Sequence, residues 1–316
     1  MDKDRERKRY RPKKDYQQEV TAADLTEKVN GHLDTLIDAL KTGNTERLTN
    51  YLAFSSRFHR YSRRNQELIY LQKPEATRVA NYGKWKTEGY QVAEGQKGIR
   101  IFVPKFPKGY KQLFAEQQNE DATQNEEAAK AKEVFFVTRH FTVGSVFDVS
   151  QLTPEKRPPE FFTAIQGDHQ ALHERLIRAV QTEGIVYQES VATQGARGYS
   201  AGGLIVVRPD QSAGNKAAIT AHEWAHEIMH KQAERATLPK QIKEAHAEAT
   251  AFVVLSHFGV TIPYSAEYVQ MWGNTHESVR KELELVAGAA TQIIEKLHAL
   301  EPGEQRFHDQ AEQDSI

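Results

Sequence analysis

The sequence contains no cysteine among its 316 residues, so it can form neither a disulfide bond nor a thiolate ligand for a metal. Any bound metal must therefore be held by histidine, aspartate or glutamate. Nowhere does the chain contain the roughly 18 consecutive apolar residues that a transmembrane helix requires. Residues 1–14 also lack the apolar stretch of a secretory signal. We expect a cytoplasmic protein with no contact to a membrane.

Net charge is also small, at -1, but charge is unevenly distributed along the chain. Residues 1–14 carry eight basic against three acidic residues, and we expect residues 1–16 to be a disordered basic tail. Residues 51–110 carry twelve basic against four acidic residues, an excess of eight. Such an excess is typical of a surface that binds a polyanion. A solvated face that acidic segments balance elsewhere would give the same count.

In the N-terminal half, apolar spacing predicts two helices, and short apolar runs between glycines predict a small antiparallel sheet. The expected helices cover residues 21–40 and about 45–71, and the expected strands cover 78–82, 90–92, 99–104, 134–141 and 145–149. The segment 106–133 is polar and acidic, so we interpret it as a mobile insert between two strands, with a short exposed helix as the alternative.

Prolines 154, 158 and 159 mark the boundary between two expected domains, 17–152 and 153–316. In the second domain the pattern predicts helices at about 161–182, 215–235, 239–258 and 275–300, with a strand at 203–207 before the second of them. The whole chain is thus predicted to have an α+β fold.

The strongest chemical signal is the pair His222 and His226 in the expected helix 215–235. Residues four apart lie on one face of a helix, so both imidazoles can reach one zinc ion. Glu223 lies beside them, where it can act as the general base toward a water molecule that attacks a carbonyl group. The motif predicts a zinc-dependent metallopeptidase centre, with Mn²⁺ or another divalent metal as alternatives.

A third ligand should come from the next expected helix, 239–258. The candidates there are Glu244, His246 and Glu248, and we favour Glu248 because it lies deeper in the apolar run. Glu244 is the alternative, and the glutamate that does not bind metal could orient a histidine ligand. His230 lies roughly 12 Å along the helix from His222, too far to share the ion. We expect His230 to contact one of the residues that bind the metal, to contact a substrate, or to face only solvent.

A second signal is a run of aromatic and basic residues in the N-terminal half. Bases of single-stranded DNA stack on aromatic rings while arginine and lysine contact the phosphates. Aromatic residues at helical spacing, such as Phe54 and Phe58, are as readily explained as core. The residues expected to bind DNA are Arg57, Arg60, Tyr61, Arg64, Tyr82, Trp85, Lys97 and Arg100.

Together the two signals resemble the ArdC antirestriction family. The resemblance rests on residues 61–104, which read YSRRNQELIYLQ, then a tryptophan, then KGI and a strand ending in proline, and on the His222–Glu223–His226 motif with the later EAHAEATAF segment. It implies a single-stranded-DNA-binding domain followed by a zincin-like metallopeptidase domain of the ImmA/IrrE type. It also implies a protein of a mobile element that shields incoming DNA from restriction.

Three functions remain open from the sequence. The first is a DNA-protecting protein that binds single strands and carries a metallopeptidase domain. The second is a regulatory metalloprotease that cleaves a repressor or a restriction-system protein, with DNA serving to localise it. The third is a DNA-binding module with a purely structural metal site. Glu223 argues against the third function, because a structural site needs no general base.

Overall fold

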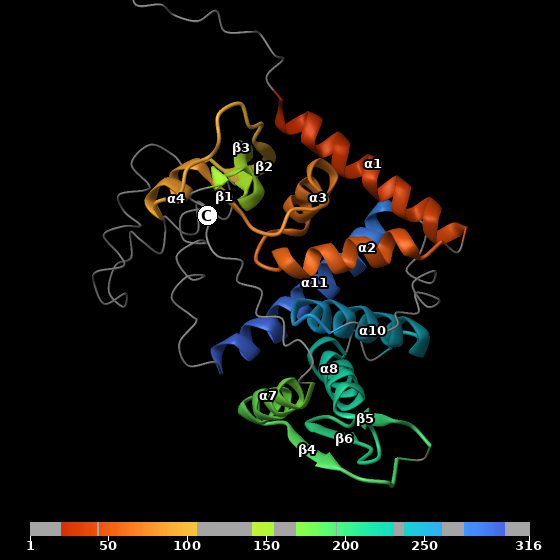
Figure 1. The fold of residues 1–316 in the computed structure, drawn as a ribbon. Helices are drawn as coiled ribbons and strands as arrows, with labels where there is room; N and C mark the ends of the chain where they lie inside the picture. The colour runs from red at the N-terminus through yellow and green to blue at the C-terminus, as the bar shows by residue number, and fades with distance from the viewer. Residues whose placement is uncertain are drawn as a thin grey trace, which may run out of the picture.

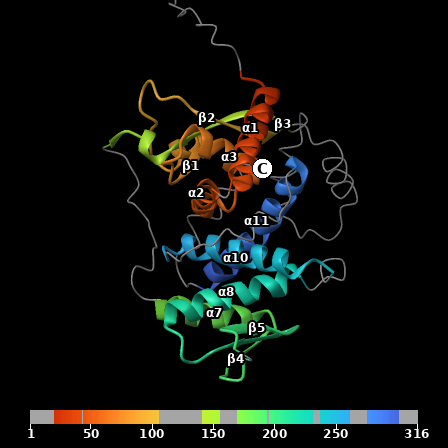
Figure 2. The same cartoon turned by 90° about the vertical axis from the view of Figure 1, so that its right-hand side faces the viewer.

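Helices form the middle of the molecule, and a three-stranded sheet lies toward either end (Figures 1 and 2). The computed structural model describes residues 20–42, 44–105, 141–154, 169–193, 195–230, 237–260 and 275–300. The expected tail 1–16, the insert 106–133 and the segment 155–168 lie outside these residues. The prediction of an α+β fold is confirmed.

The N-terminal half combines four α-helices and two short 3-10 helices, as far as the structure describes it, with an antiparallel sheet in the order β1-β3-β2. Its elements are α1 (Ala22–Lys41), α2 (Glu46–Ser55), η1 (Ser56–Phe58), α3 (Arg63–Gln72), β1 (Val79–Asn81), α4 (Tyr82–Thr87), β2 (Ile99–Pro104), β3 (Phe141–Asp148) and η2 (Val149–Gln151). The expected strand 90–92 is reduced to one bridge between Val92 and Leu152.

The helix predicted at 45–71 is in fact two helices with a turn between them. Ser62 ends the turn because its side chain accepts a hydrogen bond from the backbone N–H of Asn65 and so caps α3. The buried amide of Gln66 donates to the carbonyl oxygens of Phe58 and Tyr61, both at 2.9 Å. These hydrogen bonds satisfy the turn's carbonyls, which apolar spacing does not reveal.

Two side-chain amides attach α3 to the edge of β2. Asn65 donates to the carbonyl of Phe102 and accepts from its N–H, both at 2.9 Å. Gln72 makes the same pair of bonds with Arg100, at 2.8 and 2.9 Å. The amides thus occupy backbone groups that an edge strand would otherwise expose, and they explain why asparagine and glutamine stand at these positions.

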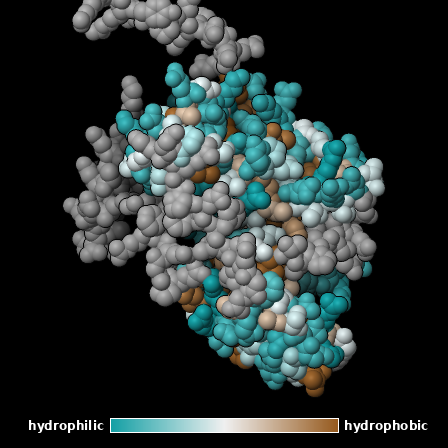
Figure 3. Space-filling model, viewed as in Figure 1, coloured by the Kyte–Doolittle hydropathy of each residue, from teal (hydrophilic) through white to brown (hydrophobic). Residues whose placement is uncertain are grey.

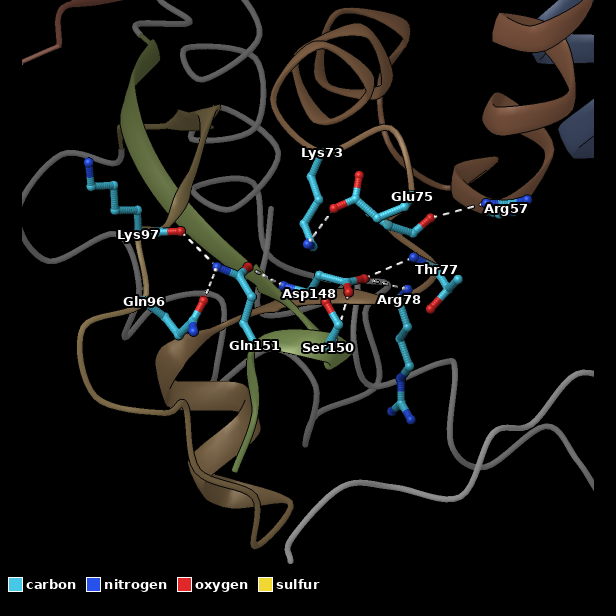
Figure 4. A network of polar contacts seen from close by, with 11 residues as sticks. Arg57, Lys73, Glu75, Thr77, Arg78, Gln96, Lys97, Asp148, Ser150 and Gln151 are labelled. Carbon is cyan, nitrogen blue, oxygen red and sulfur yellow. Dashed lines mark hydrogen bonds and ion pairs between the residues drawn. The ribbon is translucent and has the colours of Figure 1, made fainter. Parts of the chain in front are cut away.

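A buried carboxylate joins the ends of the strands in this half (Figure 4). Asp148 accepts hydrogen bonds from the backbone N–H groups of Thr77, Arg78 and Ser150 at 2.8, 3.2 and 2.9 Å. Its own N–H donates to Gln151, whose amide donates in turn to the carbonyl of Lys97. The network fixes β1 and the turn before β2 against the end of β3.

The C-terminal half packs long helices on a mixed sheet. Its elements are α7 (His169–Thr182), β4 (Val186–Glu189), β5 (Gly198–Ser200), β6 (Leu204–Val207), α8 (Ala213–Met229), α10 (Lys240–His257) and α11 (His276–Ala299). β6 lies in the centre of the sheet, parallel to β4 and antiparallel to β5. The three last helices begin and end within a few residues of the predicted positions, apart from the end of α8.

The largest buried cluster contains residues of both halves. Leu33 and Leu36 of α1 and Tyr51 of α2 belong to the same cluster as Val286 and Ile293 of α11. Helix α10 contacts α2 on one side and α8 on another, so it lies between the two halves (Figure 2). The proposed boundary at residue 152 stays a prediction, but it does not separate two independent cores.

The surface seen in Figure 3 is mostly hydrophilic over the described residues. None of the described helices combines the length and the apolar character needed to cross a membrane.

Strand β5 packs closely on α8. A Cβ atom at Gly198 would lie 2.4 Å from Cγ2 of Ile219 and 2.8 Å from the carbonyl oxygen of Val206. The carboxylate of Glu227 on α8 accepts from the N–H groups of Gly202 and Gly203 at 3.0 and 2.8 Å, and both glycines have positive φ angles. Thus α8 also holds the turn between β5 and β6.

We expect Gly198→Ala to lower the free energy of unfolding by about 1–3 kcal/mol, because the added methyl group meets backbone that cannot move away freely. Gly31→Ala at an exposed position of α1, where a Cβ atom meets nothing within 4 Å, is the matched control. It should instead raise stability by about 1 kcal/mol. Chemical denaturation measures the free energy of unfolding of both variants. Equal changes in this free energy would contradict the close packing of β5 on α8.

Candidate metal centre and nucleic-acid surface

Helices α8 and α10 bring two histidines and one glutamate together. His222 Nε2 and His226 Nε2 lie 3.1 Å apart, and Oε2 of Glu244 lies 3.2 Å from the first and 3.7 Å from the second. All three side chains are partly exposed. Within the part of the chain that the structure describes, this is the only such trio of potential metal ligands.

The distances fit a metal ion better than they fit three hydrogen-bonded groups. Ligands of a tetrahedral zinc ion at about 2.0–2.1 Å lie roughly 3.4 Å from one another, close to the separations in this trio. A neutral imidazole carries only one N–H, so two facing Nε2 atoms and a carboxylate cannot all be satisfied by neutral histidines. The carboxyl pKa of Glu244 is lowered by its side-chain hydrogen bonds with His222 and His226, which keeps this oxygen ligand ionised.

The third member of the trio is Glu244, the alternative in the sequence analysis, whereas the residue favoured there was Glu248. Depth in the apolar run was the reason for that choice, but the crossing of the two helices decides which turn of α10 faces the histidines. Glu248 lies one turn beyond Glu244 and is outside the trio. Glu244 is partly exposed, so the trio is open to solvent on one side.

Glu223 lies beside the trio, between α8 and β5. Its side chain is 8% exposed, and its Cγ would lie 3.8 Å from a Cβ atom at Gly198. Burial raises the pKa of its carboxyl group, while the charges of His222 and His226 and a contact with Ser200 oppose the rise. A carboxylate with a raised pKa is a better proton acceptor, as the sequence prediction requires. Ser200 had no signal in the sequence.

The sequence left the role of His230 open, and the structure shows which residue it contacts. It stands outside the trio, at the end of α8, and its Nδ1 lies 2.9 Å from Nδ1 of His226. Among its three expected roles, the geometry favours contact with a ligand histidine.

In the N-terminal half, Trp85 was predicted to stack on DNA bases, and the structure contradicts this role. Its side chain is 0% exposed and its indole N–H donates to the carbonyl of Phe147 at 2.8 Å. The neighbouring glycines suggested turns, but Asn81 caps a short helix by accepting from the N–H of Lys84. This helix, α4, turns Trp85 inward against β3.

Two further predicted DNA contacts have structural partners. The hydroxyl of Tyr61 donates to the carbonyl of Val79 at 3.1 Å, and its ring lies at the edge of the core. Arg57 is exposed but donates to the carbonyl of Ala76 at 3.3 Å (Figure 4). Arg60 is half-buried.

The remaining predicted contacts are on the surface. Tyr82 is 53% exposed at the start of α4, and Arg64, Lys97 and Arg100 are exposed on α3, before β2 and on β2. The side chain of Lys97 points away from the Asp148 network in Figure 4. Arg100 donates to the hydroxyl of Ser145 at 2.5 Å and still faces solvent. These four side chains are available to a ligand.

Residues 14–143 match the family described as the N-terminal domain of anti-restriction factor ArdC. This match supports the assignment to the ArdC antirestriction family that the resemblance predicted.

Individual relatives are distant. An uncharacterized protein of Bacillus anthracis is 24% identical over 344 aligned residues, which cover 96% of this chain and 56% of that protein. The chain thus spans little more than half the length of this relative. The crystal structure of the antirestriction ArdC protein from the R388 plasmid, in its Mn(II)-bound form, is 18% identical and covers 86% of this chain and 97% of that chain, with a TM-score of 0.49. Its metal-free form is 19% identical, covers 75% and 83%, and has a TM-score of 0.43.

We expect Glu244→Ala to weaken zinc binding by more than the roughly 10–100-fold that follows loss of a group outside the ligand shell. Glu248→Ala, the same change one turn later on the same helix, is the matched control and should have the smaller effect. Competition titration against a chromophoric chelator measures both affinities. The opposite order would exchange the roles of the two glutamates.

Proposed function

We propose that this chain is an antirestriction protein that binds single-stranded DNA through its N-terminal half and a divalent metal ion through its C-terminal half. The match of residues 14–143 to the N-terminal domain of anti-restriction factor ArdC is the observation that carries this function. By binding the strand, the protein would shield the incoming DNA of a mobile element from restriction. Its partners would be the DNA strand and, at the metal centre, a protein substrate.

The DNA-binding part is supported by charge and exposure. Basic residues exceed acidic ones by eight in residues 51–110, and Arg64, Lys97 and Arg100 among them face solvent. Cationic side chains of this kind neutralise phosphates and release counterions. The exposed ring of Tyr82 offers a surface on which a base can stack. Single strands expose the base faces that such stacking needs, and duplexes do not.

The metal part is supported by the trio His222, His226 and Glu244. Two imidazoles and one carboxylate suit zinc, and Mn²⁺ or another divalent ion is compatible with them. When bound, such an ion supplies a Lewis acid that polarises a carbonyl group. The protein's own contribution would come from Glu223, which accepts a proton from the attacking water and passes it to the leaving amine. This chemistry is that of a metallopeptidase.

The second function, a regulatory metalloprotease, is favoured by one observation. Glu223 is buried beside the trio with a raised pKa, an arrangement that a purely structural metal site does not need. The two functions differ in whether protection of DNA requires hydrolysis, and one substitution can separate them.

We expect Tyr82→Ala in the full chain to weaken binding of single-stranded DNA by about 1–3 kcal/mol, with little change in salt dependence, because one stacking contact is lost. Tyr199→Ala, which removes an exposed tyrosine of the C-terminal half, is the matched control and should leave affinity unchanged. Fluorescence anisotropy with a labelled oligonucleotide, at several salt concentrations, measures both. Equal affinities of the two variants for single-stranded DNA, or tighter binding to duplex DNA, would contradict the proposal that the surface around Tyr82 binds single strands.

We expect Glu223→Gln to retain metal, DNA binding and protection from restriction, because shielding depends on the N-terminal half, and to lose any peptide hydrolysis. The glutamine keeps the shape of the side chain but cannot accept a proton. The readouts are metal content, anisotropy and plasmid transfer into restricting cells. Loss of protection with intact DNA binding would instead establish the regulatory metalloprotease.

A further inference from the structure

Behind the metal trio, a row of side chains leads from the metal ligand His226 into the protein. His226 Nδ1 lies 2.9 Å from Nδ1 of His230, and Nε2 of His230 lies 3.3 Å from Nδ1 of His246. Nε2 of His246 then lies 2.6 Å from Oε2 of Glu282. The row joins α8, α10 and α11, and His246 is 0% exposed at its centre.

The direction of these hydrogen bonds follows from counting protons. A neutral imidazole has one N–H and one lone pair. If His226 binds a metal through Nε2, its only N–H is on Nδ1, and it must donate to Nδ1 of His230. His230 then donates from Nε2 to Nδ1 of His246, which donates from Nε2 to Glu282. Every donor finds one acceptor, and the row ends on a carboxylate, which only accepts.

The opposite direction is incompatible with a metal ligand. It would require a protonated Glu282 to donate to His246, and each histidine would then donate toward His226. The single hydrogen of His226 would lie on Nε2, where it would block the ion. The polarity of the row is therefore coupled to metal binding at His226.

We infer that His230, His246 and Glu282 are positioning residues that hold His226 in the tautomer and ring orientation needed to bind the metal. This inference rests on the metal centre proposed above. A histidine ligand commonly donates its second N–H to a carboxylate or carbonyl, and loss of that partner typically weakens metal binding 10–100-fold. Here two further histidines carry the same interaction to a carboxylate on a third helix.

The test compares two substitutions at one position by zinc titration of the full chain. His230→Leu removes the acceptor for His226, and zinc affinity should fall about 10–100-fold. In His230→Asn the side-chain oxygen stands near the position of Nδ1 and can accept the same hydrogen bond, so most of the affinity should return. Glu282→Gln should weaken binding to a lesser degree, because its amide oxygen still accepts.

His276→Leu is the matched control, because this histidine of α11 pairs with Asp34 away from the row. It should leave zinc affinity unchanged. If His230→Leu and His276→Leu bind zinc equally well, the inference about the row is wrong, although the metal centre is still supported. If the unsubstituted chain binds no zinc, the metal centre itself fails.

A second measurement needs no substitution. In ¹⁵N-labelled, zinc-loaded protein, long-range ¹H–¹⁵N NMR spectra report which ring nitrogen carries the hydrogen. We expect Nδ1–H at His226 and Nε2–H at both His230 and His246. A hydrogen on Nδ1 of His246 would overturn the inferred direction of the hydrogen bonds in the row. This result would count even if the variants at position 230 failed to fold.

Discussion

The crossing of α8 and α10 is the contact on which the candidate centre depends. Both helices contribute buried alanines to the core, and small side chains let two helices approach closely. They are Ala217, Ala221 and Ala225 on α8 and Ala245 and Ala249 on α10. Helices α8 and α10 contact each other, so the side chain of Glu244 reaches the histidine pair, and the same turn of α10 carries His246 to His230. One packing arrangement therefore places both the trio and the groups behind it.

Local signals predicted the elements that carry the chemistry. Ser212 caps α8 and Thr275 caps α11 with side-chain hydrogen bonds, close to the predicted starts. Four-residue spacing correctly put His222 and His226 on one face of a helix, with their Nε2 atoms 3.1 Å apart. These features depend on a few neighbouring residues, so the sequence reports them directly. The strand β2 was predicted at its full length for the same reason.

The features that the sequence did not predict depend on contacts between distant segments. Which of Glu244 and Glu248 faces the histidines is decided by the helix crossing, and depth in the apolar run does not report it. Trp85 is buried because Asn81 starts a helix that docks on β3. Glu282 had no local signal, since only the fold brings α11 to His246. Tertiary contacts therefore decide the finer details of the site.

The shared hydrophobic core links the stability of the two halves. Leu33, Leu36 and Tyr51 are buried with residues of α11, so unfolding either half would expose apolar surface of the other. Such a chain is expected to unfold in one cooperative transition. A ligand that binds only the native state adds to the stability of the whole, by about 2.7 kcal/mol at a concentration of 100 Kd. Metal bound near α8 would thus protect α1 and α2 from global unfolding, and from proteolysis of the unfolded state, without touching them.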